Sequence, residues 1–430
     1  MRYRNVLHML LVVALVSLMI AGLSIARTSA QEPVTITFWS WMIGETDKAI
    51  QDEMVAGFME ENRDIKVDLQ YIEYDQYWDK LLISVAGGTA PDIASLEPMR
   101  LPGYASRGVL LDLTERLEAW GTKDDFFTGL WVSNTWEDSV YGLPWHASDF
   151  ILYYNLDLLK AAGYDAPPTT WDELLEIALA TTRDTGDPLT TTYGYVPDLT
   201  SGAGVMFNWL PYLWSAGGDL LSPDGKSPAF NSPEGLEALN LLVDLYDNGA
   251  VPQFAVTGTW QDIQGLWVNG QAALYVSGPH LIDLTKNEAP DVNFGTAMLP
   301  AKQKPAAFHT GGNLVILANS QYPDEAWRLL QYLTDADAQR QYAEANNGVW
   351  MSSLAPRKSV YSAAFWESFP EIKSFSEALE YAQISVTPQL AEIMKPVGDA
   401  VQMATLGQIA PEDALAAAEE QVRAILAVGP

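Results

Sequence analysis

Residues 34–71 switch between two hydrophobic periods, and this switch restricts the chain to folds with a parallel sheet. Apolar side chains recur at every second position over 34–41 and again over 65–71, which predicts two strands. Between them, apolar side chains recur at every fourth position over 46–60, the period of an amphipathic helix. A strand, a helix and a strand within about forty residues predict a βαβ unit with a right-handed crossover.

The same alternation continues to the end of the chain, which places it in the α/β class rather than among all-β folds. Its 430 residues, 48% of them hydrophobic, suffice for two or three domains or one large two-lobed unit. No internal repeat or low-complexity linker marks a boundary. We expect further helices over 74–86, 170–181, 236–246, 323–333 and 411–426, and further strands over 92–96, 272–276 and 314–317.

The N-terminus has the order of a secretory signal peptide. Arg2 and Arg4 precede an apolar run over 6–26, and small residues end at Ala30, so we expect a signal over 1–30 that is cleaved after Ala30. An uncleaved membrane anchor is the alternative, since the run approaches the length of a spanning helix. Bacterial lipid attachment needs a cysteine, and the chain has none, so we expect a periplasmic or secreted protein without a lipid tether.

Charge and composition exclude several classes of function. The net charge of −31 argues against a protein that binds nucleic acid or an anionic membrane surface. The absence of cysteine excludes disulfides, thiolate metal sites and a cysteine nucleophile. His146, His280 and His309 are far apart in sequence, so we expect no metal site and no cofactor. With 55 acidic residues, any two could be imagined as a glycosidase pair, so their abundance singles out no catalytic residue.

The 15 tryptophans are the positive indication of function. Trp39 and Trp41 share one parity at the carboxyl end of the first predicted strand, the edge where open parallel sheets bind ligands, and Glu45 follows. An indole can cover the apolar C–H face of a sugar ring while nearby polar groups bind its hydroxyls. The alternative is that both indoles pack under a helix. Further tryptophans lie in loop-like segments at Trp145, Trp209, Trp214, Trp260, Trp267 and Trp350.

Several short stretches, in order and at consistent spacing, together indicate a family. They are residues 87–93 (Gly-Gly-Thr-Ala-Pro-Asp-Ile), 103–113, 142–145 (Gly-Leu-Pro-Trp), 152–159, 167–174, 214–218 (Trp-Ser-Ala-Gly-Gly), 270–274, 277–280 (Ser-Gly-Pro-His) and 309–313 (His-Thr-Gly-Gly-Asn). Each stretch alone is weak. Their order and spacing extend over nearly the whole chain after residue 30. In this combination the chain resembles the carbohydrate-binding, maltodextrin-binding-protein-like branch of the extracellular solute-binding proteins of ABC importers.

The resemblance implies a fold and a role. The fold would be a two-lobed α/β periplasmic-binding-protein type II fold with a ligand cleft between the lobes, which closes on the ligand like a clamshell. Lobe 1 would take 31–145 and 310–355, and lobe 2 would take 150–305 and 360–430. The protein would be a monomer and no enzyme: it would capture a mono- or oligosaccharide and deliver it to ABC-type permease subunits.

The resemblance also implies a set of ligand-binding residues, with the Gly311-Gly312-Asn313 segment as a turn that lets the backbone approach the ligand. The set is Trp39, Trp41, Glu45, Asp92, Glu97, Arg100, Trp145, Ser148, Asp149, Phe207, Trp209, Trp214, Trp260, His280, Gly311, Gly312, Asn313, Trp350 and Arg357. The family's usual Gly-Pro-Trp has His280 in place of the indole, and 389–395 lacks the aromatic residue of maltodextrin binders. We therefore expect a ligand other than maltodextrin.

Two alternatives stay open at this point. Aromatic rings and carboxylates also suit a polyamine, through cation–π contacts, and a peptide is another solute of that kind. A secreted glycoside hydrolase would need two carboxyl groups at a catalytic separation, and no motif selects such a pair. A purely structural surface protein fits worst, because the Gly- and Trp-rich loops resemble site loops.

Overall fold

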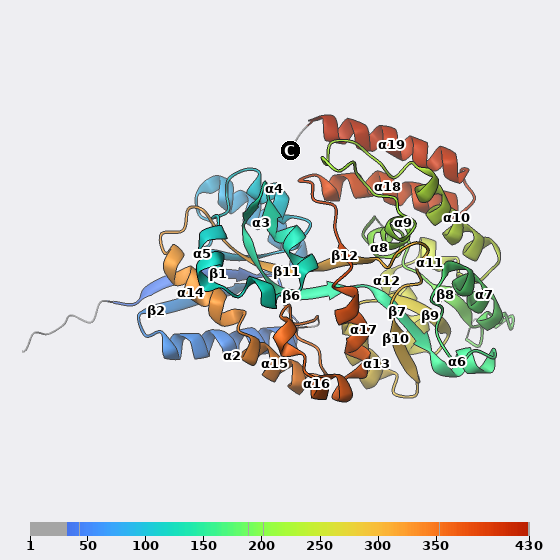
Figure 1. The fold of residues 1–430 in the computed structure, drawn as a ribbon, viewed down its shortest axis with the longest axis horizontal. Coiled ribbons are helices and arrows are strands. Elements are labelled where there is room, and N and C mark those ends of the chain that lie inside the picture. The colour runs from blue at the N-terminus through green and yellow to red at the C-terminus, as the bar shows by residue number, and fades with distance from the viewer. Residues whose placement is uncertain (1–31, 43, 188, 201, 352, 429–430) are drawn as a thin grey trace, which may run out of the picture.

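The computed structural model describes residues 32–428 except 43, 188, 201 and 352 (Figure 1). The predicted signal peptide therefore lies outside the described residues. Among the helices that the structure describes, none combines the length and the apolar character of a membrane span.

Two separate sheets organise the molecule, one in each half of the view in Figure 1. The first has the order β12-β11-β3-β1-β2, with β6 also paired to β11, and the second has the order β10-β7-β9-β8. The strands of the first sheet are β1 (Val34–Ser40), β2 (Ile65–Tyr71), β3 (Ile93–Leu96), β6 (Gly142–Asp149), β11 (Ala307–Ile316) and β12 (Ala382–Gln383). Those of the second are β7 (Ile151–Asn155), β8 (Tyr193–Val196), β9 (Ala272–Ser277) and β10 (Phe294–Ala297), and β4 (Thr135–Trp136) forms a small hairpin with β5 (Ser139–Val140).

The predicted βαβ unit is present: β1 pairs in parallel with β2 along its whole length, and the helix α2 (Glu45–Glu61) connects them. Other helices that pack near the first sheet are α3 (Tyr74–Gly87), α4 (Leu101–Ala105), α5 (Thr114–Trp120), α14 (Pro323–Leu333) and α15 (Ala336–Ala345). Short 3-10 turns occur at η1 (Lys123–Asp125), η2 (Thr128–Asn134) and η3 (Lys358–Val360).

Helix starts around the second sheet follow local sequence signals. The expected capping box at Thr170 and Glu173 opens α7 (Trp171–Thr181), and Ser232 caps α10 (Pro233–Asp247), because each hydroxyl accepts from an unpaired backbone N–H of the first turn. The remaining helices are α6 (Leu156–Ala161), α8 (Gly202–Asn208), α9 (Leu210–Ser215), α11 (Phe254–Thr257), α12 (Trp260–Val268), α13 (His280–Glu288), α16 (Ala363–Ser368), α17 (Pro370–Ala378), α18 (Leu390–Thr405) and α19 (Pro411–Val428).

The first sheet is buried on both faces along β1. Ile36 and Phe38 of β1 face a large apolar cluster with α2 and α14, whereas Trp39 on the other face packs with Tyr77 of α3. The large cluster continues to Tyr275 of the second sheet, so one core runs beneath both halves. The burial of β1 on both faces agrees with its parallel pairing to β2 and β3, since parallel strands are covered by helices on both sides.

The two sheets meet where β6 runs on into β7 and where β11 lies antiparallel to β6 (Figure 1). The register pairs Ser148 with Thr310 and His146 with Gly312, and it shifts between Gly312 and Asn313. The expected Gly311-Gly312-Asn313 turn is therefore corrected: these residues lie inside β11, and the strand shifts register there instead of turning. We call the paired segments 146–149 and 309–312 the crossing strands.

Candidate ligand-binding cleft

A cavity of about 400 Å³ opens beside the crossing strands. It is lined by the carboxyl end of β1, by the first turns of α2, α3 and α13, and by the crossing strands. This position agrees with the rule that open α/β sheets bind ligands beyond the carboxyl ends of their strands. Its lining consists of Trp41, Met42, Gly44, Asp47, Tyr74, His146, Ser148, His280, Thr310, Gly311 and Ser353.

Aromatic rings form one wall of the cavity. Trp41 follows β1, and its ring centroid lies 5.6 Å from that of Tyr74 and 5.8 Å from that of His146, both edge to face. Trp78 supports this group from behind, 6.2 Å from Trp41. Edge-to-face packing holds each ring in a fixed orientation, so the Trp41 indole presents a rigid apolar surface to the cavity.

An ion pair behind this wall fixes Tyr74. Glu97 accepts hydrogen bonds from the Tyr74 hydroxyl at 2.7 Å and from Nε of Arg100 at 2.8 Å. The Arg100 guanidinium in turn lies 4.0 Å from the centre of the Trp78 ring. Burial and the Glu97 carboxylate raise the pKa of Tyr74, so the phenol stays neutral. Glu97 and Arg100 therefore act through Tyr74 and Trp78 and neutralise each other.

His146 sits in the floor of the cavity. Its Nδ1 lies 3.2 Å from Oγ of Ser353, and its Nε2 is buried without a hydrogen-bond partner among the described residues. Burial lowers the pKa of His146 to about 3, so the imidazole is uncharged at neutral pH. Gly311 has φ +125°, which favours glycine, and a Cβ there would overlap the carbonyl oxygen of His146.

His280 lines the opposite side of the cavity at the first turn of α13. Its Nε2 lies 3.5 Å from Oγ of Ser277, and its ring is 5.9 Å from that of Trp260 and 6.5 Å from that of Phe150. Burial lowers the pKa of His280 to about 4, so this imidazole is also neutral at pH 7. It supplies a ring at the place where the resemblance leads one to expect an indole.

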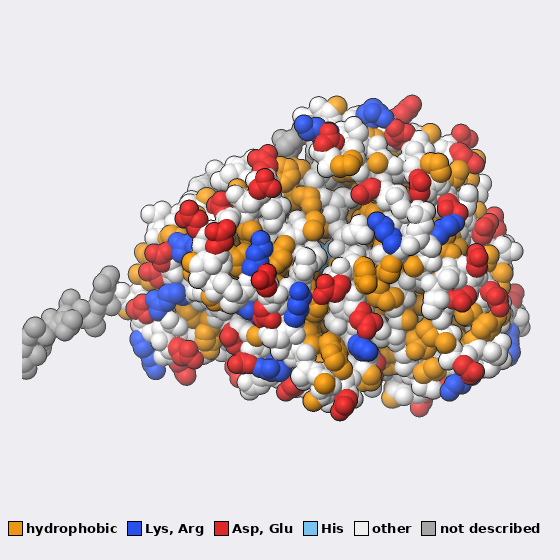
Figure 2. All heavy atoms as spheres, viewed as in Figure 1, with side chains coloured by type: hydrophobic (Ala, Val, Ile, Leu, Met, Phe, Trp, Pro, Cys, Tyr) orange, Lys and Arg blue, Asp and Glu red, His pale blue; other side chains and the backbone are white. Residues whose placement is uncertain are grey.

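The charged group in the lining of the cavity is acidic. Asp47 is the one ionisable carboxylate among the described lining residues, and no lysine or arginine lines the cavity there. Figure 2 shows acidic side chains scattered over one face of the molecule, with single lysines and arginines between them. A neutral or cationic ligand fits this environment better than an anion does.

Four residues of the predicted set line the cavity: Trp41, Ser148, His280 and Gly311. Glu97 and Arg100 stand behind its wall. Four others lie near the lining without being part of it: Gly312 lies under the His146 ring, Trp260 lies next to His280, Phe207 stacks on Phe150 with centroids 3.9 Å apart, and the exposed Glu45 pairs with Lys48 at 3.3 Å.

Other members of the predicted set belong to the cores, which corrects their expected exposure to the cleft. Trp145 and Trp350 are fully buried and joined by a hydrogen bond from Nε1 of Trp350 to the Trp145 carbonyl at 2.9 Å. Trp209 is also fully buried, and Trp39 is covered by α3, where Lys80 lies 4.4 Å from its ring. The alternative that Trp39 and Trp41 both pack under a helix therefore holds for Trp39, whereas Trp41 lines the cavity.

Three polar members that fall outside the cavity, Asp92, Arg357 and Asn313, hold the framework together. Asp92 accepts from Thr37 and Ser320 and ties β1 to the turn after β11. Arg357 donates to the Thr334 carbonyl and to Asp125, beneath the rings of Trp120 and Phe126, so it does not face the cleft as expected. Asn313 accepts from Asn134 at 2.9 Å. Asp149, on the opposite side of β6 from Ser148, is fully buried, and burial raises its pKa.

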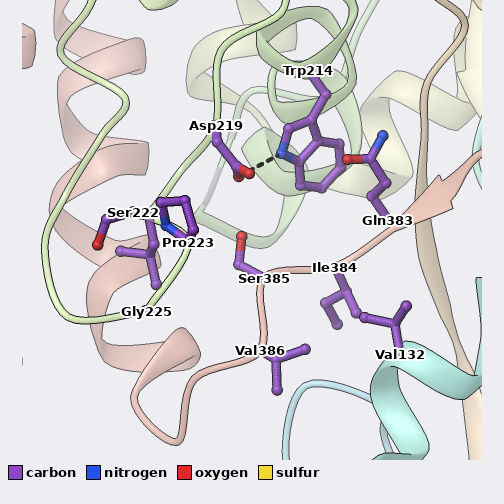
Figure 3. Close-up of a pocket in the computed structure, with 11 residues that line it drawn as sticks. Val132, Trp214, Asp219, Ser222, Pro223, Gly225, Gln383, Ile384, Ser385 and Val386 are labelled. Carbon is purple, nitrogen blue, oxygen red and sulfur yellow. Dashed lines mark hydrogen bonds between the residues drawn. The ribbon is translucent and has the colours of Figure 1, made fainter.

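Trp214 lines a second cavity, of about 320 Å³, with Gln383, Ser385 and the 219–225 loop. Figure 3 shows its indole donating from Nε1 to Asp219, at 3.1 Å. Asp219 therefore already satisfies the indole N–H, whereas Oγ of Ser385 in the same lining is buried without a partner among the described residues.

Sequence reasoning missed Asp47, Tyr74, His146, Thr310 and Ser353. Parity could have found His146, because a residue two positions from Ser148 on a strand lies on the same face. Tyr74 follows the carboxyl end of the second predicted strand, as Trp41 follows the first. Ser353 carries no such signal, since it comes from a distant loop. Among the described residues, no group of three or more His, Asp or Glu could hold a metal ion.

The molecule has two separate sheets and a cavity beside the crossing strands that join them. This arrangement is that of a two-lobed α/β binding protein. The chain belongs to the family of bacterial extracellular solute-binding proteins, whose pattern it matches over residues 53–374. A putative binding protein of Brucella abortus is 27% identical to it over 385 residues, which cover 87% of this chain and 89% of that protein.

Solved structures of the same kind are similar over nearly the whole chain. An ABC transporter solute-binding protein of Thermotoga lettingae, bound with α-D-tagatose, has a TM-score of 0.76 and 29% identity and covers 91% of this chain and 99% of its own. The cyclic α-maltosyl-1,6-maltose-binding protein of Arthrobacter globiformis has a TM-score of 0.80 and 28% identity, with 92% and 100% covered. The two-lobed α/β fold predicted from the sequence is confirmed.

Proposed function

We propose that this protein captures a neutral mono- or oligosaccharide in the cleft and delivers it to the permease of an ABC importer. The observation that carries the proposal is the pairing of a rigid indole face, Trp41, with the free hydroxyls of Ser148 and Thr310 across one cavity. A sugar ring has an apolar face and a polar edge, and this cavity offers a partner for each. The sugar ligands of the similar structures support the same class of ligand.

Binding without bond cleavage is part of the proposal. Glycosidases need two carboxyl groups about 5–10 Å apart across the scissile bond. In the described lining only Asp47 supplies a carboxylate, and Glu97 is held by Arg100 and Tyr74. We also propose that residues 1–30 are a cleaved signal, that the lobes have the limits expected above, and that the protein acts as an extracytoplasmic monomer.

One observation favours a second candidate ligand class. Asp47, together with the faces of Trp41 and Tyr74, could bind the ammonium group of a polyamine through an ion pair and cation–π contacts. The free hydroxyls of Ser148 and Thr310 have no evident partner in that case, so we place this candidate second.

A thermal-shift panel separates the two candidates, since a ligand that binds only the folded state raises the Tm. The panel contains D-galactose, D-tagatose, L-arabinose and maltose against putrescine and spermidine, with gluconate as an anion. A Tm rise with at least one sugar and none with the amines is the expected result. A response to the amines alone would replace the proposal with the polyamine candidate, and released reducing ends from an oligosaccharide would indicate a hydrolase instead.

A further inference from the structure

The crossing strands present three polar side chains to the cavity on one face. His146 and Ser148 are two residues apart on β6 and so point to the same side, and Thr310 stands directly opposite Ser148 on β11. All three line the cavity, whereas Asp149 and His309 occupy the opposite face of the same strands. We call His146, Ser148 and Thr310 the polar strip.

The members of the polar strip have hydrogen-bonding capacity left over. The side-chain hydroxyls of Ser148 and Thr310 make no hydrogen bond with the rest of the described chain, and Nε2 of His146 has no partner there either. Ser148 is 7% and His146 3% exposed. Buried polar atoms in native proteins are paired with protein, water or ligand, so the buried Nε2 of His146 requires a partner, and the two accessible hydroxyls beside it on the same cavity wall can reach the same ligand.

The chemistry of the polar strip suits hydroxyl groups. A serine or threonine hydroxyl both donates and accepts, and a neutral imidazole donates from one nitrogen and accepts at the other. A sugar hydroxyl has the same dual character, whereas an ammonium group only donates. Directly opposed residues on antiparallel strands have Cβ atoms about 5 Å apart, a spacing that lets two side chains contact neighbouring substituents of one ring.

We infer that the polar strip is the specificity-determining element of the cleft, and that it binds two neighbouring ring hydroxyls of the sugar whose apolar face lies on Trp41. This inference rests on the proposed function and adds to it the atoms that select the sugar. It assigns His146 and Thr310, which the sequence did not indicate, a direct contact with the ligand.

The experiment uses the full chain and the sugar of the thermal-shift panel that gives the largest Tm rise, with calorimetric Kd values for the parent sugar and its monodeoxy derivatives. Thr310→Val keeps the shape of the side chain and removes its hydroxyl, and Ser148→Ala does the same for Ser148. Thr35→Val, at an exposed position on β1, is the matched control. We expect the Kd to rise about tenfold in Thr310→Val and in Ser148→Ala and to stay the same in the control. The Tm of the ligand-free protein should be unchanged in all three variants.

The monodeoxy sugars distinguish a direct contact from a merely structural role of these side chains. For the derivative that lacks the contacted hydroxyl, Thr310→Val or Ser148→Ala should bring no further loss. If both variants bind the parent sugar with a Kd within twofold of the wild type while Trp41→Ala does not, the inference that the polar strip contacts the sugar is wrong. The proposed function then stands. If no sugar of the panel binds the wild type, the proposed function fails and this inference fails with it.

Discussion

The imidazole of His146 occupies the space that a side chain at position 312 would fill: a Cβ added to Gly312 would overlap Nε2 of the ring. The two residues are paired across β6 and β11, so the missing side chain of one strand makes room for the ring of the other. The glycine therefore sets the position of a cavity-lining imidazole although it does not line the cavity itself.

Gly312→Ala should displace the His146 ring and weaken sugar binding about tenfold, with a loss of about 1–3 kcal/mol in the free energy of unfolding from overpacking. Calorimetric titration and urea unfolding measure the two effects. Gly265→Ala on α12 is the matched control, because a Cβ there meets nothing within 4 Å, and it should leave affinity unchanged. Equal affinity of Gly312→Ala and wild type would show that the ring position does not matter for the ligand.

Trp41→Ala should remove the stacking surface and weaken sugar binding about tenfold or more. Trp366→Ala is the comparison, since this indole stacks on Tyr361 at 4.8 Å on the other side of the core. It should lower the Tm and leave the Kd unchanged. A Kd for Trp41→Ala within twofold of the wild type would mean that the indole is part of the framework only.

His146 should make stability depend on pH. Its pKa is lowered to about 3 in the folded protein by burial, against about 6.5 in an unfolded chain, so the unfolded state takes up its proton first as the pH falls. Its contribution to stability is complete above pH 6.5 and declines toward pH 3, by roughly 2 kcal/mol at pH 5. The difference in unfolding free energy between wild type and His146→Asn should shrink by that amount from pH 7 to pH 5. Parallel pH profiles would contradict a buried neutral imidazole.

Arg357→Met should destabilise the protein by about 2–4 kcal/mol, because it removes a buried cation from Asp125 and from the Thr334 carbonyl. Sugar affinity should stay the same, since Arg357 lies away from the cleft. Denaturant unfolding and calorimetric titration of the same sample test both halves. A large loss of sugar affinity in a stably folded variant would show instead that Arg357 belongs to the ligand site.

Periodicity alone predicted most of the framework. The strand of 34–41, the helix of 46–60 and the strand of 65–71 appear as β1, α2 and β2 within a residue or two, and the capping box at Thr170 opens α7 as expected. Hydrophobic period and cap residues act over a few positions, so they can be seen without the rest of the chain.

The site was harder to predict because it depends on which side of each element is covered by distant parts of the chain. Trp39 and Trp41 have the same parity, yet α3 covers Trp39 and leaves Trp41 at the cavity. Trp145 looked like a loop residue, but it sits on a strand inside the largest core. Both outcomes are tertiary effects that no local pattern records.

A crystal structure of the complex with the sugar that gives the largest Tm rise is the most direct test of the account. We predict one sugar in the cavity, with its apolar face on Trp41 and two adjacent hydroxyls within hydrogen-bond distance of Ser148, Thr310 or His146. A sugar bound in the cavity beside Trp214 and Gln383, with the Trp41 cavity filled only by water, would contradict it.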